Sequence, residues 1–352
     1  MIFIPLSTYK YPVLDLPQIK HVHVEITTRC NARCPMCPRN YRGMDFNSGY
    51  PLTELRLEDF KKIFQSAFLK QLWKYPKQGM TFNGNLGDFA AAKDAFEIVE
   101  YVTSYGVGVT VNTNGSLRSG DWWAKLARPQ LAIGFAIDGL VDTHSLYRQD
   151  TDWKKVLDNA TAFIRAGGRA IWRFIPFEHN QHQEAECRKL ARDLGFSQFQ
   201  IVYDGRDHTP VFSREGNFTH WIGQSQAKYP HPSPIEHLLE DHRNSSCSTQ
   251  SWEHDGINLR IDCKHINERS IYVAADGSVY PCCFLGFYPQ SMTHPGNEQI
   301  QTLVKENNAL EFDLEHCLNW FRSVQSTWSI PSVREGRLYQ CAATCGQKIS
   351  NT

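Results

Sequence analysis

The chain has 352 residues, which is enough for one large catalytic domain with a smaller companion. Lysine plus arginine equals aspartate plus glutamate at 37 each, so no whole-chain charge directs the protein to nucleic acid or to an anionic membrane. The first residues do not have the pattern of a signal peptide, and no apolar run of about 18 residues follows, which predicts a cytoplasmic protein without membrane association. Eleven cysteines in such a chain favour metal or redox chemistry over disulfides.

Short β-rich runs alternate with helical patterns along the first 205 residues or so. Six strands are expected, at residues 21–28, 79–84, 106–113, 131–138, 169–177 and 199–204. Five helices are expected between them, near residues 53–73, 90–105, 119–127, 152–166 and 181–194. Gly106, Gly167 and Gly195 stand where three of these helices should end. The alternation predicts an α/β fold with a parallel sheet or incomplete barrel, whose chemistry lies in the loops at the carboxyl ends of the strands.

Three cysteines follow the first expected strand, in the segment TTRCNARCPMCPR. Cys30, Cys34 and Cys37 have the spacing C-x3-C-x2-C on a polar, turning loop. Three thiolates on one 4Fe–4S cubane leave a fourth iron open for a substrate or cofactor. On spacing alone, the alternative is a zinc site whose fourth ligand, such as a histidine, comes from elsewhere in the chain.

This cysteine loop resembles that of the radical S-adenosylmethionine (SAM) superfamily, and three further segments carry the resemblance. NGNLGD (83–88) follows the second strand, where the family has a Gly-Gly-Glu-like segment. NTNG (112–115) follows the third strand, and AIDG (136–139) ends the fourth and is followed by HSLYR. The resemblance implies a partial (β/α)6 barrel, which we assign to residues 1–205. Two residues depart from the family pattern: Met36 stands where an aromatic residue is common, and Asp88 replaces the glutamate.

The resemblance implies that the three cysteines hold a 4Fe–4S cluster whose open iron binds SAM. The ammonium and carboxylate of the methionyl group need an acid and a cation, for which Asp88 and Arg148 are the candidates unless they are only solvated surface charges. Asn112 and Asn114 are candidates for the ribose, unless their segment is only a turn. The other residues expected around SAM are Met36, Gly84, Asn85, Gly87 and Asp138.

A second group of cysteines lies near the carboxyl terminus, after residues 206–254, which we expect to be a linker or irregular segment. Cys263 and Cys282 enclose two short strands about an Asp-Gly turn, and helical spacing puts Cys341 and Cys345 on one face. Residues 255–352 resemble the SPASM/twitch extension of radical SAM enzymes, which implies a small α+β domain with one auxiliary 4Fe–4S cluster on these four thiols. A zinc knuckle on the same thiols is the alternative.

Four cysteines remain outside these two groups. Cys283 and Cys317 are possible substitutes for one of the four auxiliary ligands. Cys187 and Cys247 are expected to be plain buried or surface thiols.

The resemblance implies an oxidoreductase that cleaves SAM reductively and abstracts hydrogen from a substrate C–H bond, with electrons from a donor such as flavodoxin or ferredoxin. We expect the substrate to be a sugar or other small molecule of natural-product biosynthesis, and the outcome to be net oxidation. A ribosomal-peptide maturase or an epimerase is the alternative. A non-catalytic iron–sulfur or zinc binding module is the alternative from another class. No nucleic-acid or membrane partner is expected.

Overall fold

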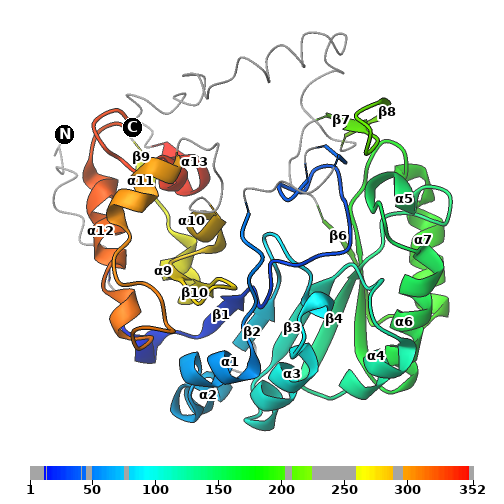
Figure 1. The fold of residues 1–352 in the computed structure, drawn as a ribbon, viewed down its shortest axis with the longest axis horizontal. Helices are drawn as coiled ribbons and strands as arrows, with labels where there is room; N and C mark the ends of the chain where they lie inside the picture. The colour runs from blue at the N-terminus through cyan, green and yellow to red at the C-terminus, as the bar shows by residue number, and fades with distance from the viewer. Residues whose placement is uncertain are drawn as a thin grey trace.

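The computed structural model describes residue 12 and residues 14–40, 42–44, 50–74, 79–202, 208–223, 259–287 and 296–348. Six parallel strands lie side by side in chain order at its centre (Figure 1). They are β1 (His21–Val24), β2 (Gly79–Phe82), β3 (Val109–Thr113), β4 (Leu131–Ala136), β5 (Arg169–Phe174) and β6 (Gln198–Ile201). The predicted α/β class and partial barrel are therefore confirmed.

Helices follow each of the first five strands and lie along the outer side of the curved sheet (Figure 1). They are α1 (Leu57–Ile63), α2 (Ser66–Trp73), η3 (Phe89–Ala91), α3 (Ala95–Ser104), α4 (Gly120–Leu126), α5 (His144–Tyr147), α6 (Trp153–Arg165), η4 (Gln181–Gln183) and α7 (Glu184–Asp193). Gly106, Gly167 and Gly195 follow α3, α6 and α7 with φ of +78°, +87° and +87°, a conformation that only glycine adopts freely. The three predicted helix ends are confirmed.

The sheet continues beyond β1 into the carboxyl-terminal part of the chain. β10 (Ser270–Val273) pairs in parallel with β1, and β11 (Val279–Tyr280) pairs antiparallel with β10. Gly277, at φ +88°, forms the predicted Asp-Gly turn between these two strands. The eight-stranded sheet has the order β11-β10-β1-β2-β3-β4-β5-β6, so the carboxyl-terminal region shares the sheet of the barrel.

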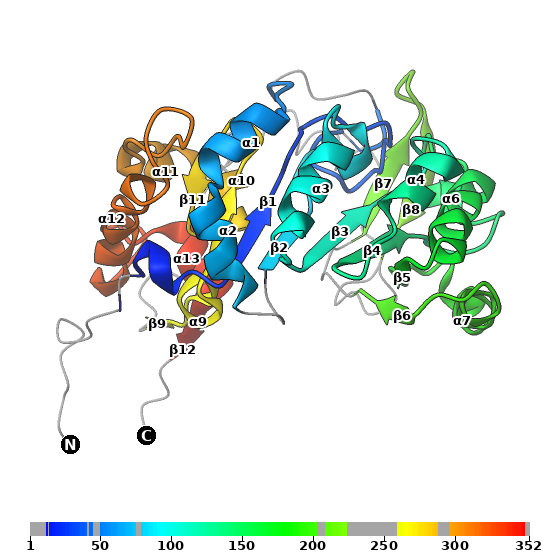
Figure 2. The same ribbon diagram turned by 90° about the horizontal axis from the view of Figure 1, so that it is seen from below.

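The other carboxyl-terminal elements gather at the β11 edge of this sheet (Figure 2). β9 (Leu259–Ile261) pairs with β12 (Gly346–Lys348), and α13 (Tyr339–Cys345) carries Cys341 and Cys345 on one helix, as the spacing predicts. The remaining helices of this region are α9 (Lys264–Glu268), α10 (Cys283–Phe287), α11 (Gly296–Leu303), η7 (His316–Leu318), α12 (Phe321–Ser326) and η8 (Thr327–Ser329). A short helix near the amino terminus is η2 (Leu16–Gln18).

Part of the expected irregular segment 206–254 is a β-hairpin, which corrects the sequence prediction. β7 (Thr209–Phe212) and β8 (Phe218–Ile222) pair antiparallel, and residues 206–207 and 224–254 lie outside the described residues. Val211 and Ile222 are buried against Ala32, Cys34 and other apolar side chains at the mouth of the barrel. This burial stabilises the hairpin in a stretch whose overall composition is polar.

Across the described part of the chain, every helix is too short or too polar to cross a lipid bilayer.

Candidate functional site

A cavity of about 330 Å³ opens at the carboxyl ends of the parallel strands. Its walls come from the loops after β1 to β4 and from the ends of β5 and β6, which is where a parallel sheet presents its chemistry. The residues that line it are Cys30, Ala32, Cys34, Cys37, Pro38, Asn83, Gly84, Asn85, Leu86, Gly87, Asp88, Asn112, Thr113, Asn114, Ala136, Tyr147, Arg148, Arg173, Ile175 and Val202. All three cysteines of the C-x3-C-x2-C motif are among them.

The cysteine loop is held in a compact turn with its thiols facing the cavity. The Cys37 N–H donates to the Cys34 carbonyl at 3.0 Å, and the Ala32 N–H lies 3.4 Å from the Cys30 Sγ. Burial raises the pKa of Cys30, and the charges of Asp88 and the other two thiols raise it further. A bound cation would offset this cost, because a metal ion favours the thiolate.

Glu25, directly after β1, fixes the loop that follows β2. Its Oε1 accepts the N–H groups of Leu86 and Gly87 at 2.7 and 2.8 Å, and its Oε2 accepts the hydroxyl of Tyr272 at 2.8 Å. A Cβ on Gly87 would stand 1.8 Å from the Thr27 carbonyl oxygen, so this close approach requires glycine. Glu25 was not predicted as a site residue. Its only signal in the sequence is that an acid directly follows HVHV, in which polar and apolar residues alternate.

Asp88 lies in the cavity wall and also ties two loops together. Its carboxylate accepts the Ala90 N–H at 2.9 Å, the Thr113 hydroxyl at 2.8 Å and the Asn114 N–H at 2.7 Å. Burial raises its pKa, and these hydrogen bonds act in the opposite direction. Asp88 therefore lies in the cavity wall and also organises the loop after β3.

Arg148 is a partly buried cation between the cysteine loop and Asp138. Its Nε donates to the Asp138 Oδ2 at 2.6 Å, and its Nη1 lies 3.7 Å from the Cys34 Sγ. Burial acts to lower the pKa of Arg148, but the charges of Asp138 and Cys34 raise it well above the ordinary value. Asp138 is fully buried, and its Oδ1 accepts the Ile175 N–H at 2.6 Å. It does not line the cavity.

Arg173 on β5 is a second cation in the cavity wall, and the sequence analysis missed it. Its Nη1 donates to the Gln200 Oε1 at 3.2 Å, while burial and the charge of Arg148 lower its pKa. The available signal was an arginine that follows three apolar residues within a strand.

The predicted asparagines divide into one open acceptor and two engaged side chains. The Asn112 Oδ1 is buried without a hydrogen-bond partner, which marks it as an acceptor for a ligand. Asn114 donates to Asn31 at 3.0 Å and lies 3.7 Å from the Cys30 Sγ, and Asn85 donates to the Cys283 carbonyl at 2.9 Å. Met36, within the cysteine loop, packs against the apolar cluster that includes Ala32 and Cys34 and does not line the cavity.

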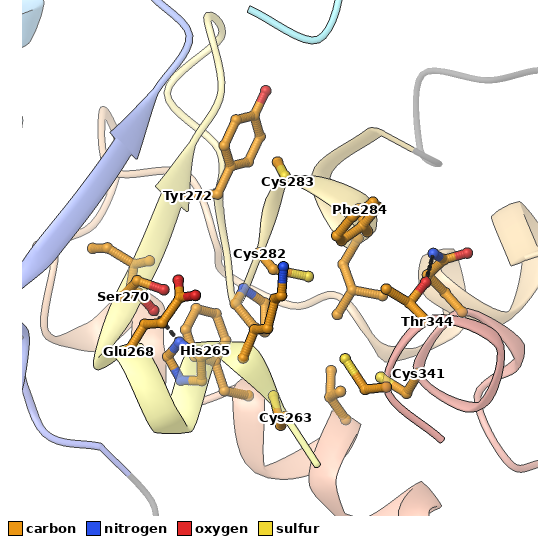
Figure 3. A pocket seen from close by; sticks show the side chains of 18 of the residues that line it. Cys263, His265, Glu268, Ser270, Tyr272, Cys282, Cys283, Phe284, Cys341 and Thr344 are labelled. Carbon is orange, nitrogen blue, oxygen red and sulfur yellow. Dashed lines mark hydrogen bonds between the residues drawn. The ribbon is translucent and has the colours of Figure 1, made fainter. Parts of the chain in front are cut away.

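A second cavity of about 250 Å³ holds the carboxyl-terminal cysteines (Figure 3). Cys263, Cys282, Cys341 and Cys345 line it, and Cys341 interacts electrostatically with the other three thiols. Burial raises the pKa of Cys263 to about 11 and raises those of Cys282 and Cys341 as well. The structure thus brings the four predicted thiols together.

The other cysteines take different positions. Cys283 also lines the second cavity, but Figure 3 shows it apart from Cys263 and Cys341 and beside Tyr272. Cys317 and Cys187 are fully buried and lie outside both cavities, and Cys247 lies outside the described residues.

Within the described ranges, no three His, Cys, Asp or Glu side chains stand close enough to share one metal ion. The thiolates of a 4Fe–4S cluster bind different irons, whereas those of a zinc site meet at one ion. Metal analysis distinguishes the two.

Comparison with known proteins agrees with this geometry. Residues 24–186 match the family model of the Radical SAM superfamily, so this part of the chain is a radical SAM domain. Enzymes of this superfamily use a 4Fe–4S cluster and SAM.

Solved structures match the fold over most of the chain. Streptococcus suis SuiB bound to S-adenosylmethionine superposes with a TM-score of 0.52 and 13% identity, over 85% of this chain and 65% of SuiB. Streptococcus suis SuiB bound to precursor peptide SuiA superposes with a TM-score of 0.50 and 11% identity, over 87% of this chain and 67% of SuiB. At these identities the likeness shows the fold alone.

A curated relative matches a shorter segment. Over 110 residues the chain is 28% identical to the tungsten-containing aldehyde ferredoxin oxidoreductase cofactor-modifying protein of Pyrococcus furiosus. The aligned segment covers 31% of this chain and 28% of that protein, so the chain spans well under two thirds of this relative.

Proposed function

We propose that this protein is a radical SAM enzyme whose first cluster is held by Cys30, Cys34 and Cys37. The observation that carries the proposal is that these three thiols line one cavity together with the partly buried cation Arg148 and the unpartnered acceptor of Asn112. When bound, the cluster would supply the electron that splits the sulfonium of SAM, and the 5'-deoxyadenosyl radical would abstract hydrogen from the substrate. The residues present fit a group with three thiolate ligands and one open position.

Side chains of the cavity are suited to orient SAM. Arg148 lies beside Cys34 and is assigned to the methionyl carboxylate, with Asp138 fixing its direction. Asp88 supplies negative charge near the ammonium, and the open acceptor of Asn112 suits a ribose hydroxyl. The cavity and the hairpin β7–β8 at its mouth limit the access of water to a reactive radical.

We further propose that Cys263, Cys282, Cys341 and Cys345 hold an auxiliary 4Fe–4S cluster. Four thiols around one apolar cavity support this assignment. Burial raises the pKa values of Cys263, Cys282 and Cys341, which indicates a cost of charge that metal binding would relieve. Cys283 is a less suitable ligand because it faces Tyr272.

We propose a small molecule of natural-product biosynthesis as the substrate, with net oxidation as the outcome. The auxiliary cluster supports oxidation, because a substrate radical that is oxidised must lose an electron to an acceptor. A peptide is the second candidate, because SuiB, which shares the fold, carries a precursor peptide in one solved structure.

The first prediction tests SAM cleavage. Reconstituted protein with dithionite should convert SAM to 5'-deoxyadenosine, and Cys34→Ala should abolish this conversion because one cluster ligand is lost. Chromatography of the products is the measurement. Cys187→Ala is the matched control, since this thiol is buried away from both cavities, and it should retain cleavage. Wild-type cleavage by Cys34→Ala would show that the site is misassigned.

The second prediction concerns metal content. Anaerobically reconstituted protein should contain about eight irons and eight sulfides per chain, and Cys341→Ala should contain about four of each. Cys317→Ala, which alters a buried thiol outside the cavity, should keep the wild-type content. About four irons in the wild type would exclude the auxiliary cluster, and stoichiometric zinc would exclude both assignments.

A further inference from the structure

An open hollow at the surface has Cys30 in its wall, and Cys30 also lines the cavity at the carboxyl ends of the strands, the proposed SAM cavity. Three of the residues that line the hollow are cations, namely Arg29, Lys93 and Arg118, and none is an acid. Cys30, one of the predicted cluster ligands, therefore borders a positively charged hollow at the surface.

The three cations are placed to act on a partner in solution. Arg29 is exposed, and the side chain of Lys93 is 69% exposed, with Glu54 as an ion-pair partner at 3.7 Å. A pair of this length at the surface is worth little and leaves Lys93 available to a partner. Arg118 is held rigidly by hydrogen bonds to the Ala90 and Ala92 carbonyls at 2.8 and 2.6 Å, and these bonds leave its positive charge in place.

A fourth cation extends this surface along the cysteine loop. Arg39 interacts electrostatically with the thiols of Cys30 and Cys37 and with Arg29. The whole chain has no net charge. Four cations around one loop are therefore a local concentration of positive charge.

We propose that this hollow is the docking surface for an acidic one-electron carrier protein. The inference rests on the proposed function, in which the cluster held by Cys30, Cys34 and Cys37 must first be reduced by one electron from outside the chain before it can cleave SAM. In the transfer the carrier is oxidised by one electron and the iron–sulfur group by Cys30 is reduced by one, without making or breaking a bond. An acidic carrier is favoured because opposite charge accelerates encounter and orients the two proteins.

The test reverses two charges of the hollow and leaves the cysteines intact. Reduced flavodoxin, an acidic carrier, serves as the probe with the Arg29→Glu/Lys93→Glu variant. Calorimetry at low salt should show flavodoxin binding weakened at least about tenfold, and flavodoxin-driven SAM cleavage should fall in parallel. Dithionite-driven cleavage should stay within about twofold of the wild type, because this small reductant needs no docking surface.

Lys70→Glu/Lys189→Glu is the matched control, since it reverses two exposed lysines on α2 and α7, away from the hollow. Its flavodoxin binding should equal that of the wild type. Three results would contradict the docking surface. They are an equal loss of flavodoxin binding in both double variants, unchanged flavodoxin binding by Arg29→Glu/Lys93→Glu, and a dithionite-driven rate that falls as much as the flavodoxin-driven rate in that variant. A wild type that cleaves no SAM with dithionite would contradict the proposed function instead, while the binding measurement would still decide the docking surface.

Discussion

Three buried carboxylates organise the loops of the candidate site, one after each of three strands. Glu25 accepts backbone N–H groups of Leu86 and Gly87, Asp88 accepts that of Asn114, and Asp138 accepts that of Ile175. Each acid thus fixes the loop or strand end that follows a neighbouring strand. Buried carboxylates are costly unless hydrogen-bonded, and backbone N–H donors meet that need. The acids position the cavity wall as well as supplying charge.

The third prediction tests the Glu25–Tyr272 contact, which joins the loop after β2 to strand β10. Tyr272→Phe removes the hydroxyl that donates to Glu25 and accepts from Asn85 at 3.2 Å. Loss of this buried hydrogen bond to a charged group should lower the free energy of unfolding by about 2 kcal/mol and weaken SAM binding several-fold. Urea unfolding and calorimetric titration of SAM are the measurements.

Tyr280→Phe is the control for that variant. Tyr280 is also a buried tyrosine, on β11, but it does not line the SAM cavity. It should lose stability without a change in SAM affinity. If Tyr272→Phe bound SAM as tightly as the wild type, the contact would be structural only.

At the scale of elements, the sequence predicted each barrel strand but extended most of them too far. Four strands were expected to end at residues 28, 84, 138 and 177, and they end at Val24, Phe82, Ala136 and Phe174. The intervening residues include Glu25, Gly84 and Asp138, which leave the sheet to build or support the cavity. Local alternation of apolar residues continues through these segments, so it cannot indicate where the backbone turns toward the site.

Local sequence patterns could not predict which strands far apart in the sequence pair with one another. Tyr272 and Glu25 are 247 positions apart in the sequence, yet β10 lies directly beside β1. The hairpin β7–β8 was missed for a related reason, because its burial comes from the distant cysteine loop. The cysteine groups were found because their spacing is itself a local signal.

At the scale of the whole molecule, the barrel and the carboxyl-terminal region that carries the second group of cysteines share one sheet. Val22 and Val24 of β1 and Val273 of β10 are all fully buried, and the backbone of β1 is hydrogen-bonded to β10 along its length. Without β10, β1 would become an edge strand with unpaired backbone groups and an uncovered apolar side. We therefore infer that the expected first domain, residues 1–205, does not fold alone.

The last prediction tests this dependence. A chain that ends after Gly223 should be insoluble, or should unfold without a cooperative transition, because the exposed edge of β1 and its apolar surroundings favour association. Full-length Cys341→Ala is the control, since it removes a proposed cluster ligand and keeps both strands, and it should unfold cooperatively. Solubility after expression and urea unfolding followed by far-ultraviolet circular dichroism are the measurements. A soluble, cooperatively unfolding fragment 1–223 would instead establish the barrel as an independent domain, in which β10 serves only to place the second group of cysteines beside the SAM cavity.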